Sequence, residues 1–195
     1  CTEHFVVRFE GGDSTAVSGS LSSGVTHVFA TVNAFAALRT GGAVVTWGSS
    51  NSGGNSSAVS GSLASGVTRV FATSQAFAAL KADGSVATWG RPGTGGDSSA
   101  VAPSLTSGVT QVFSNEQAFA ALKGDGSVVT WGDSGSGGDS SSAAARLASG
   151  VTRIFSTAGA FAAVKGDGSV VAWGDSAGGG DAGSVAPALA SGVTT

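Results

Sequence analysis

His4 and His27 are the only histidines in the chain, and histidine is the side chain that most often acts as a general acid or base. Both lie near the N-terminus, outside the positions that recur along the chain. The positions equivalent to His27 hold Arg69, Gln111 and Arg153. A catalytic base needs a nucleophile or a second carboxylate beside it, and no such pair recurs. The sequence therefore predicts no catalytic residue and a protein that is not an enzyme.

Two glycine-rich stretches match short functional patterns. Residues 132–135 (GDSG) resemble the nucleophile segment of chymotrypsin-like proteases, but the equivalent loops read Gly-Ser-Ser at 48–50 and Gly-Arg-Pro at 90–92. No His/Asp pair accompanies the serine, so a turn is expected. Residues 178–183 have dinucleotide-binding spacing without the βαβ setting that gives those glycines their role. No cofactor is expected.

Asp133 and Asp139 bracket a loop with enough oxygen atoms to suggest a Ca²⁺ site. In other repeats the first carboxylate is replaced by Ser49 or Arg91, so no ligand set recurs and no metal is predicted. The alternative is that the second aspartate caps a turn through its side chain. That role is expected at four equivalent positions, Asp13, Asp97, Asp139 and Asp181.

Three lysines and an arginine form a basic column beside the predicted turns: Arg39, Lys81, Lys123 and Lys165. They suit either a repeated polyanion site or a solvated hairpin end that discourages strand pairing. The chain has nine basic residues and a net charge of −3, which favours the second interpretation. The same balance predicts no nucleic-acid partner.

Two single residues suggest modification. Residues 55–57 (NSS) are an N-glycosylation sequon, so Asn55 is the candidate acceptor if the protein is extracellular. Cys1 is the only cysteine and cannot form an internal disulfide. Its alternatives are an intermolecular disulfide, a lipid anchor or no role. The absence of Met suggests that the sequence begins after processing or within a longer polypeptide.

The elements that would position these residues are hairpins. Residues 118–132 (AFAALKGDGSVVTWG) recur closely at 76–90 and 160–174, and loosely at 34–48. Asp-Gly between two apolar runs predicts a β-hairpin with a two-residue type I′ turn. In that register Phe119 faces Gly132 and Ala120 faces Trp131, so that each large ring meets a small residue. The predicted turn residues are Asp83, Gly84, Asp125, Gly126, Asp167 and Gly168.

The hairpin belongs to a repeat of 42 residues that has no insertion or deletion. The chain of 195 residues holds about 4.6 such units. We expect an atypical N-terminal strand or cap at residues 1–10 and one continuous repeat domain at 11–195. The predicted structural core consists of three aromatic columns: Trp47, Trp89, Trp131 and Trp173; Phe35, Phe77, Phe119 and Phe161; Phe29, Phe71, Phe113 and Phe155.

One unit contains three short predicted strands, at 109–114, 118–123 and 127–131, and a fourth segment at 137–147. That segment is either a short helix capped by Asp139 or Ser140, or a loop with an outer strand. Four short segments in about 40–50 residues have the size of one propeller blade. The predicted fold is all-β, with tandem antiparallel blade-like repeats in a propeller or an open spiral. A β-solenoid is the alternative. No apolar run is long enough for a membrane span.

Residues 109–132 (VTQVFSNEQAFAALKGDGSVVTWG) resemble the repeat of the regulator of chromosome condensation family, and the resemblance extends over the four complete units. It implies propeller blades and a protein–protein interaction module. Two features differ from the family pattern. The family's histidine is replaced by alanine at Ala34, Ala76, Ala118 and Ala160, and Gly-Gly-Asp-Ser follows the Trp-Gly segment. The unit is also short, which favours an open spiral or a piece of a longer array.

The leading functional hypothesis is a structural scaffold, expected to be extracellular, whose modules join end to end into arrays or fibres. Self-association through unpaired ends would then be its main interaction. The alternative is a propeller-type module that binds a protein partner on one face.

Overall fold

In the computed structural model, described for residues 12–181, the chain forms four repeats of one small antiparallel sheet. The predicted strand or cap at residues 1–10 lies outside the described residues. We name the repeats unit 1 (13–54), unit 2 (55–96), unit 3 (97–138) and unit 4 (139–180). Each unit has short helical turns followed by three strands and a further turn.

The three strands of each unit pair in sequence order, with the middle strand in the centre. They are β1 (Val25–Ala30), β2 (Ala34–Arg39) and β3 (Val44–Gly48); β4 (Val67–Ala72), β5 (Ala76–Lys81) and β6 (Val86–Gly90); β7 (Val109–Ser114), β8 (Ala118–Lys123) and β9 (Val128–Gly132); β10 (Val151–Ser156), β11 (Ala160–Lys165) and β12 (Val170–Gly174).

Short helical segments precede and follow each sheet. They are η1 (Thr15–Val17), α1 (Ser18–Leu21), η2 (Ser50–Ser52), η3 (Ser57–Val59), α2 (Ser60–Leu63), η4 (Pro92–Thr94), η5 (Ser99–Leu105), η6 (Ser134–Gly138), η7 (Ser141–Ala143), α3 (Ala144–Leu147) and η8 (Ser176–Gly180). Of the two forms predicted for the fourth segment, the structure has the short helix. Neither η7 nor α3 has a side-chain hydrogen bond from its N-cap residue, so the predicted helix cap is wrong. Asp139 instead accepts a hydrogen bond from the Ser141 amide at 2.8 Å and so closes the turn before η7.

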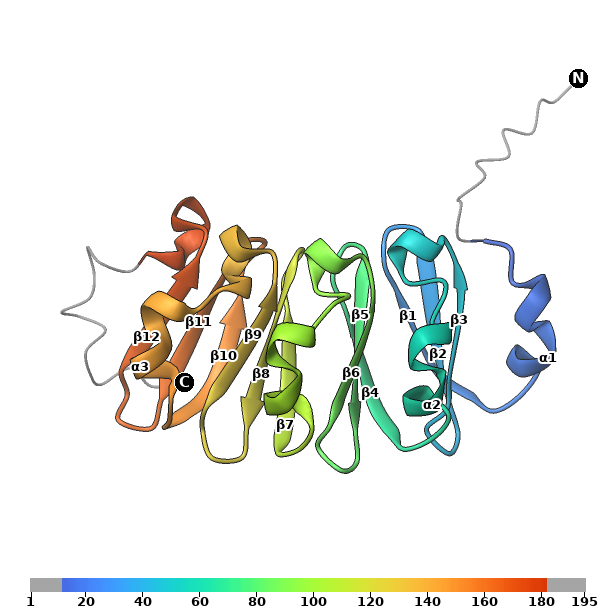
Figure 1. Cartoon of the computed structure of the whole chain (residues 1–195), viewed down its shortest axis with the longest axis horizontal. Helices are drawn as coiled ribbons and strands as arrows, with labels where there is room; N and C mark the ends of the chain where they lie inside the picture. The colour runs from blue at the N-terminus through green and yellow to red at the C-terminus, as the bar shows by residue number, and fades with distance from the viewer. Residues whose placement is uncertain (1–11, 182–195) are drawn as a thin grey trace, which may run out of the picture.

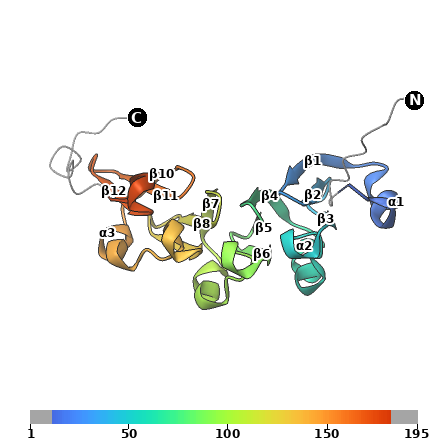
Figure 2. The ribbon, with the colours of Figure 1, turned by 90° about the horizontal axis from the view of Figure 1, so that it is seen from above.

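The units stand side by side in sequence order (Figure 1) and follow an open arc when seen from above (Figure 2). The first strands β1, β4, β7 and β10 lie on the concave side of the arc, and the helical segments lie on the convex side. Tandem antiparallel blades in an open arrangement confirm the predicted fold class. The β-solenoid alternative does not match these separate three-stranded sheets.

The hairpin turn differs from the predicted two-residue type I′ turn. The Gly126 amide donates to the Lys123 carbonyl at 3.0 Å, and the Lys123 amide donates to the Ser127 carbonyl at 2.9 Å. Only Gly126 has a positive φ, of 78°, so the loop has three residues and ends in a left-handed glycine, as in hairpins with a G1 bulge. The prediction was wrong because Asp125 keeps a negative φ and instead accepts a hydrogen bond from the Ser127 amide.

One extra loop residue shifts the register by one and changes which side chains meet. Phe119 pairs with Trp131, and Ala118 pairs with Gly132, so the predicted pairing of each ring with a small residue is wrong. The two rings stack with their centroids 5.3 Å apart. The other three units repeat this stack at 5.2–5.4 Å. Paired aromatic residues therefore form one compact block per unit.

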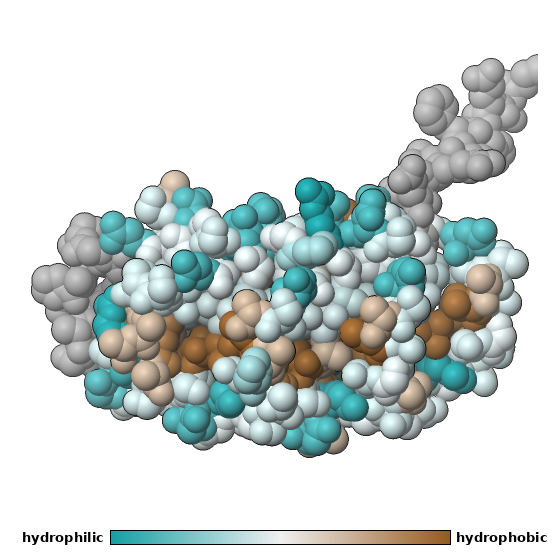
Figure 3. All heavy atoms as spheres, viewed as in Figure 1, coloured by the Kyte–Doolittle hydropathy of each residue, from teal (hydrophilic) through white to brown (hydrophobic). Residues whose placement is uncertain are grey.

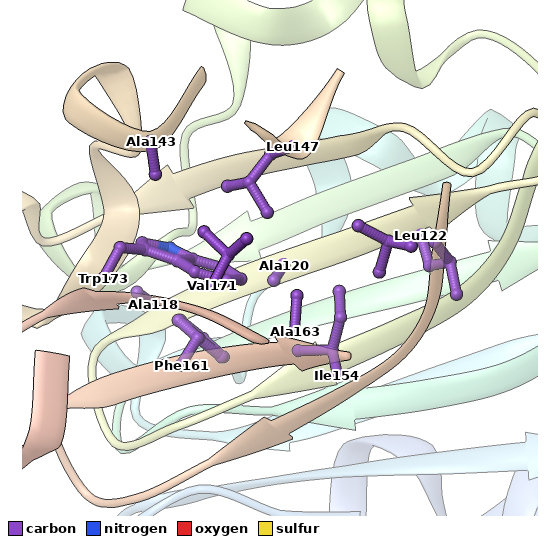
Figure 4. Close-up of a cluster of buried hydrophobic side chains, with 11 residues drawn as sticks. Ala118, Ala120, Leu122, Ala143, Leu147, Ile154, Phe161, Ala163, Val171 and Trp173 are labelled. Atoms are coloured by element: carbon purple, nitrogen blue, oxygen red, sulfur yellow. The ribbon is translucent and has the colours of Figure 1, made fainter. Parts of the chain in front are cut away.

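The hydrophobic core lies between the units and not within them. Each of the three clusters combines alanines and a leucine from the middle strand of one unit with the Phe–Trp block, valines and a helical leucine of the next. Figure 4 shows the last of these, where Ala118, Ala120 and Leu122 of β8 meet Leu147, Phe161 and Trp173 of unit 4. Because successive strand residues point to opposite faces, the blades of units 2 and 3 each pack on both of their neighbours.

Candidate interaction surfaces

The contact between neighbouring units repeats with the same atoms at each of the three junctions. The indole Nε1 of Trp131 donates to the Gly95 carbonyl at 3.1 Å, and the Trp89 and Trp173 indoles make the same bond at 3.0 Å. At the opposite edge the Val109 amide donates to the Gly84 carbonyl at 3.0 Å. Buried donors and acceptors are thus paired across each junction.

The columns of Trp131 and Phe119 point toward the preceding unit, and the column of Phe113 points toward the following unit. Phe77, Phe119 and Phe161 are fully buried, together with Trp89, Trp131 and Trp173. Phe35 and Trp47 of unit 1 are half-buried. Phe29, Phe71 and Phe113 are half-buried against the core of the next unit, whereas Phe155 is 50% exposed. The stack therefore has a direction, with different faces at its two ends.

The edge that carries the hairpin turns holds the basic column. Lys123 Nζ donates to the Ser104 carbonyl and Lys165 Nζ to the Arg146 carbonyl, both at 3.0 Å. These carbonyls belong to the helical segments η5 and α3, whose last carbonyls lack helical partners. The two lysines therefore bind the helical segment of their own unit, a structural role that neither predicted alternative included.

Each Asp-Gly turn is held by its aspartate. Asp125 Oδ1 accepts from the Ser127 hydroxyl at 2.6 Å and from the Ser127 amide at 2.9 Å. Both bonds lower the pKa of Asp125 below its ordinary value. The bond from the Ser127 hydroxyl has the larger effect, and the bond from the Ser127 amide has the smaller one. The pKa values of Asp83 and Asp167 are lowered by the same pair of bonds. The turn thus prefers the ionised carboxylate.

The opposite edge, which we call the loop edge, consists of the turn after each first strand and the loop after each third strand. Its backbone is fixed: the amide of Arg91 donates to the Gln75 carbonyl at 2.9 Å, and every unit repeats this bond at 2.8–3.0 Å. Its side chains change from unit to unit. The varying positions are Val32, Ser74, Glu116 and Ala158; Asn33, Gln75, Gln117 and Gly159; Ser49, Arg91, Asp133 and Asp175.

A backbone ladder also runs along this edge. The Val32 amide donates to the Ser74 carbonyl at 2.9 Å, the Ser74 amide to Glu116 at 2.8 Å, and the Glu116 amide to Ala158 at 3.2 Å. Each bond joins equivalent positions of adjacent units. The varying side chains of the loop edge are therefore carried on a rigid frame.

The loop edge is hollowed around Arg91, whose exposed guanidinium donates to Gln75 Oε1 at 2.9 Å. A groove of about 440 Å³ lies between units 2 and 3, lined by Gln75, Arg91, Gln117 and Asp133 among others. A second, of about 400 Å³, includes Asn51 and Pro92. The charge changes along the edge, from neutral in unit 1 to basic in unit 2 and acidic in units 3 and 4.

The convex side carries an apolar band between polar margins (Figure 3). A groove of about 540 Å³ opens beside η5 and η7, with Val101, Val128, Val129 and part of Trp131 in its walls. Three of these residues, Val101, Val129 and Trp131, belong to the core cluster between units 2 and 3. The band is thus the outer margin of the core.

The other sequence candidates are not brought together. His27 is exposed on β1 and stacks on Phe29 with ring centroids 6.2 Å apart. Asp133 and Asp139 each accept a hydrogen bond from a nearby backbone amide. Asn55 is exposed, and its side chain accepts from the Ser57 amide at 3.0 Å. Asp13 and Asp97 cap turns as predicted.

Within residues 12–181, no group of three or more His, Cys, Asp or Glu side chains is placed to hold a metal ion. No helix in that part of the chain is long and apolar enough to cross a membrane. Cys1 lies outside the described residues. The glycine-rich residues 178–183 follow a third strand and not a βαβ unit, and their last two lie outside the described part.

No protein-family model matches the chain, and no curated protein matches it. The structure of Kap60 bound to yeast RCC1 (Prp20) matches at 15% identity and a TM-score of 0.50, over 77% of this chain and 42% of the other. Prp20p from Saccharomyces cerevisiae, studied for binding to Gsp1p and histones, matches at 16% identity and a TM-score of 0.49, over 77% and 43%.

The CRINKLY WD40 ectodomain of the Arabidopsis thaliana receptor kinase ACR4 matches at 16% identity and a TM-score of 0.49, over 77% of this chain and 49% of the other. The chain thus spans less than half the length of each of these structures. The likeness to the yeast RCC1 complex concerns the fold alone. Together with the repeated blades it defines the chain as a repeat protein of the β-propeller type.

Proposed function

We propose that the chain is a non-enzymatic interaction module that binds a protein partner through its loop edge. The observation that carries this proposal is the contrast between an almost invariant frame and side chains that vary at equivalent exposed positions. Arg91, Asp133 and Asp175 occupy one such position, and their backbone amides make the same hydrogen bond. A frame of this kind lets charge and size change without altering the blades.

Two further points support the proposal. Binding residues in repeat and propeller proteins are usually carried by loops on a rigid scaffold. The spacing VTQVFS…DGSVVTWG supports a short form of the chromosome-condensation repeat, although alanine replaces the family's histidine. We do not assign the binding partners of Prp20p to this chain. The proposal rests on the loop-edge side chains of this sequence and not on those of Prp20p.

The test is crosslinking of the tagged chain in the cells that produce it. A loop-edge variant, with Arg91→Ala, Glu116→Ala and Asp133→Ala, is compared with a hairpin-edge variant, with Lys81→Ala, Asp83→Ala and Lys123→Ala. We expect a crosslinked partner that the wild type and the hairpin-edge variant retain and the loop-edge variant loses. A partner retained by the loop-edge variant, or lost from both variants, contradicts the proposal.

A second candidate function is a structural scaffold whose copies join into arrays. The observation that favours it is the direction of the stack, because directional contacts that do not close generate filaments. The extracellular location expected for such an array stays a prediction. Electron microscopy of the purified chain distinguishes the two candidates: filaments with a regular axial repeat support the array, and discrete particles at high concentration contradict it.

A further inference from the structure

The face of unit 1 that points away from unit 2 exposes side chains that are core residues elsewhere. Val28 is 54% exposed, whereas Val70, Val112 and Ile154 at the same position are each 3% exposed. Leu21, Val25, Phe35 and Trp47 are half-buried, and their equivalents in units 2–4 are buried. We call these five residues, Leu21, Val25, Val28, Phe35 and Trp47, the leading face.

The face of unit 4 that points away from unit 3 is open in a complementary way. An added Cβ at Gly95 would lie 2.5 Å from a ring carbon of Phe119, and the equivalent glycines of units 1 and 3 are covered in the same way. At Gly179 no atom of the described residues 12–181 lies within 4 Å of that position. Phe155 is half exposed. Ala162 is half-buried, whereas the equivalent alanines of units 1–3, Ala36, Ala78 and Ala120, are fully buried. Phe155, Ala162 and Gly179 form what we call the trailing face.

We propose that the leading face of one copy binds the trailing face of a second copy, in the geometry of the internal unit junctions. This inference rests on the array function proposed above and assigns its interface. A heterologous contact of this kind repeats at every copy and does not close. The occupant is a second copy because the same contact already forms three times within the chain.

The internal junctions specify the contacts that the second copy would make. Phe29 packs in the same cluster as Val70, so Phe155 of one copy would meet Val28 of the next. The Trp47 indole would donate to the Gly179 carbonyl, as Trp173 does to Gly137 at 3.0 Å. The Ala158 amide would continue the backbone ladder by donating to the Val32 carbonyl.

The test measures sedimentation of the full chain over a wide range of concentration. We expect the wild type to assemble as its concentration rises. Val28→Asp and Phe155→Asp should each weaken association by more than about a hundredfold, because an unpaired carboxylate would be buried at the contact. Both side chains are at least half exposed in the described chain, so the folded monomer should keep its circular dichroism spectrum.

Val32→Asp is the matched control. Val32 is as exposed as Val28, at 59%, but its equivalent within the stack is Glu116, so a carboxylate is accepted there. This variant should assemble like the wild type. Mixing Val28→Asp with Phe155→Asp should give a one-to-one dimer and nothing larger, since each variant retains one intact face.

Three results would overturn the inference. A wild type that stays monomeric at all concentrations, as when residues of the same chain cover the faces, overturns both this interface and the array function. Assembly that Val28→Asp leaves unchanged overturns the interface and leaves the array function standing. Equal loss in Val32→Asp would show that added charge, and not the leading face, controls association.

Discussion

The indole Nε1 of Trp131 and the carbonyl oxygen of Gly95 lie 3.1 Å apart, although 36 residues separate them in the chain. This bond joins unit 3 to unit 2 inside a buried contact, so neither atom has water as an alternative partner. Stability in such an array is approximately a sum over units and junctions. Removal of one indole bond therefore reports how strongly two neighbouring units are coupled.

Replacement of Trp131 by phenylalanine should leave the Gly95 carbonyl without a partner. We expect a loss of about 1–3 kcal/mol in the free energy of unfolding, measured by urea denaturation. Trp173→Phe should cost a similar amount, because its indole makes the equivalent bond to Gly137. A loss of only a few tenths of a kcal/mol in both variants would show that the bond adds nothing to the contact.

Gly95→Ala and Gly179→Ala form a matched pair that isolates the fit between units. Both glycines have a positive φ, of 96° and 99°. Alanine in this left-handed conformation should lower the free energy of unfolding of both variants by about 1–2 kcal/mol. Only at Gly95 would the new methyl group meet a ring, that of Phe119. Measured at low protein concentration, Gly95→Ala should be less stable than Gly179→Ala by about 1–3 kcal/mol. Equal losses would contradict the tight junction.

Stacking of Phe119 on Trp131 predicts an energetic coupling between the two rings. A double-mutant cycle with Phe119→Leu and Trp131→Leu should give a coupling of about 0.5–1.5 kcal/mol from urea unfolding. A cycle of Trp131→Leu with Phe113→Leu serves as the control, because Phe113 packs on the opposite face of the blade. Similar coupling in both cycles would argue against the observed register.

The two-residue turn predicted from the sequence explains why this ring pair was missed. The bounds of β7 and β8 match the predicted strands, whereas β9 begins and ends one residue later. Asp-Gly alone does not distinguish a type I′ turn from a type I turn closed by a left-handed glycine. The distinguishing signal is Ser127, whose amide and hydroxyl bind Asp125. A serine two residues after the aspartate recurs in units 2–4.

Repetition in the sequence was sufficient to predict the blades, because a fixed period places identical residues at identical positions. Of the predicted aromatic columns, those of Trp131 and Phe119 are buried in units 2–4, whereas the column of Phe113 is half-buried or exposed. The alanines, leucines and valines that complete the core clusters were not predicted. Repetition was not sufficient for contacts between elements. The bond from Lys123 to the Ser104 carbonyl joins residues 19 apart, and neither residue type specifies the other. The loop edge was detectable as the position where near-identical units differ, but only the structure shows Gln75 bonded to Arg91.

Ser127→Ala tests the turn through the pKa of Asp125. Loss of the hydroxyl bond, the larger cause of the lowered pKa, should raise the pKa of Asp125 toward its ordinary value in an NMR titration. A carboxyl whose pKa is lower in the folded state stabilises the fold above its unfolded pKa, and this contribution is lost as the pH falls below about 4. The wild type should therefore lose more stability than Ser127→Ala on acidification. Asp139, whose pKa is lowered mainly by the Ser141 amide, is the internal control and should titrate identically in both proteins. An unchanged pKa of Asp125 in the variant would show that the hydroxyl of Ser127 does not hold the turn.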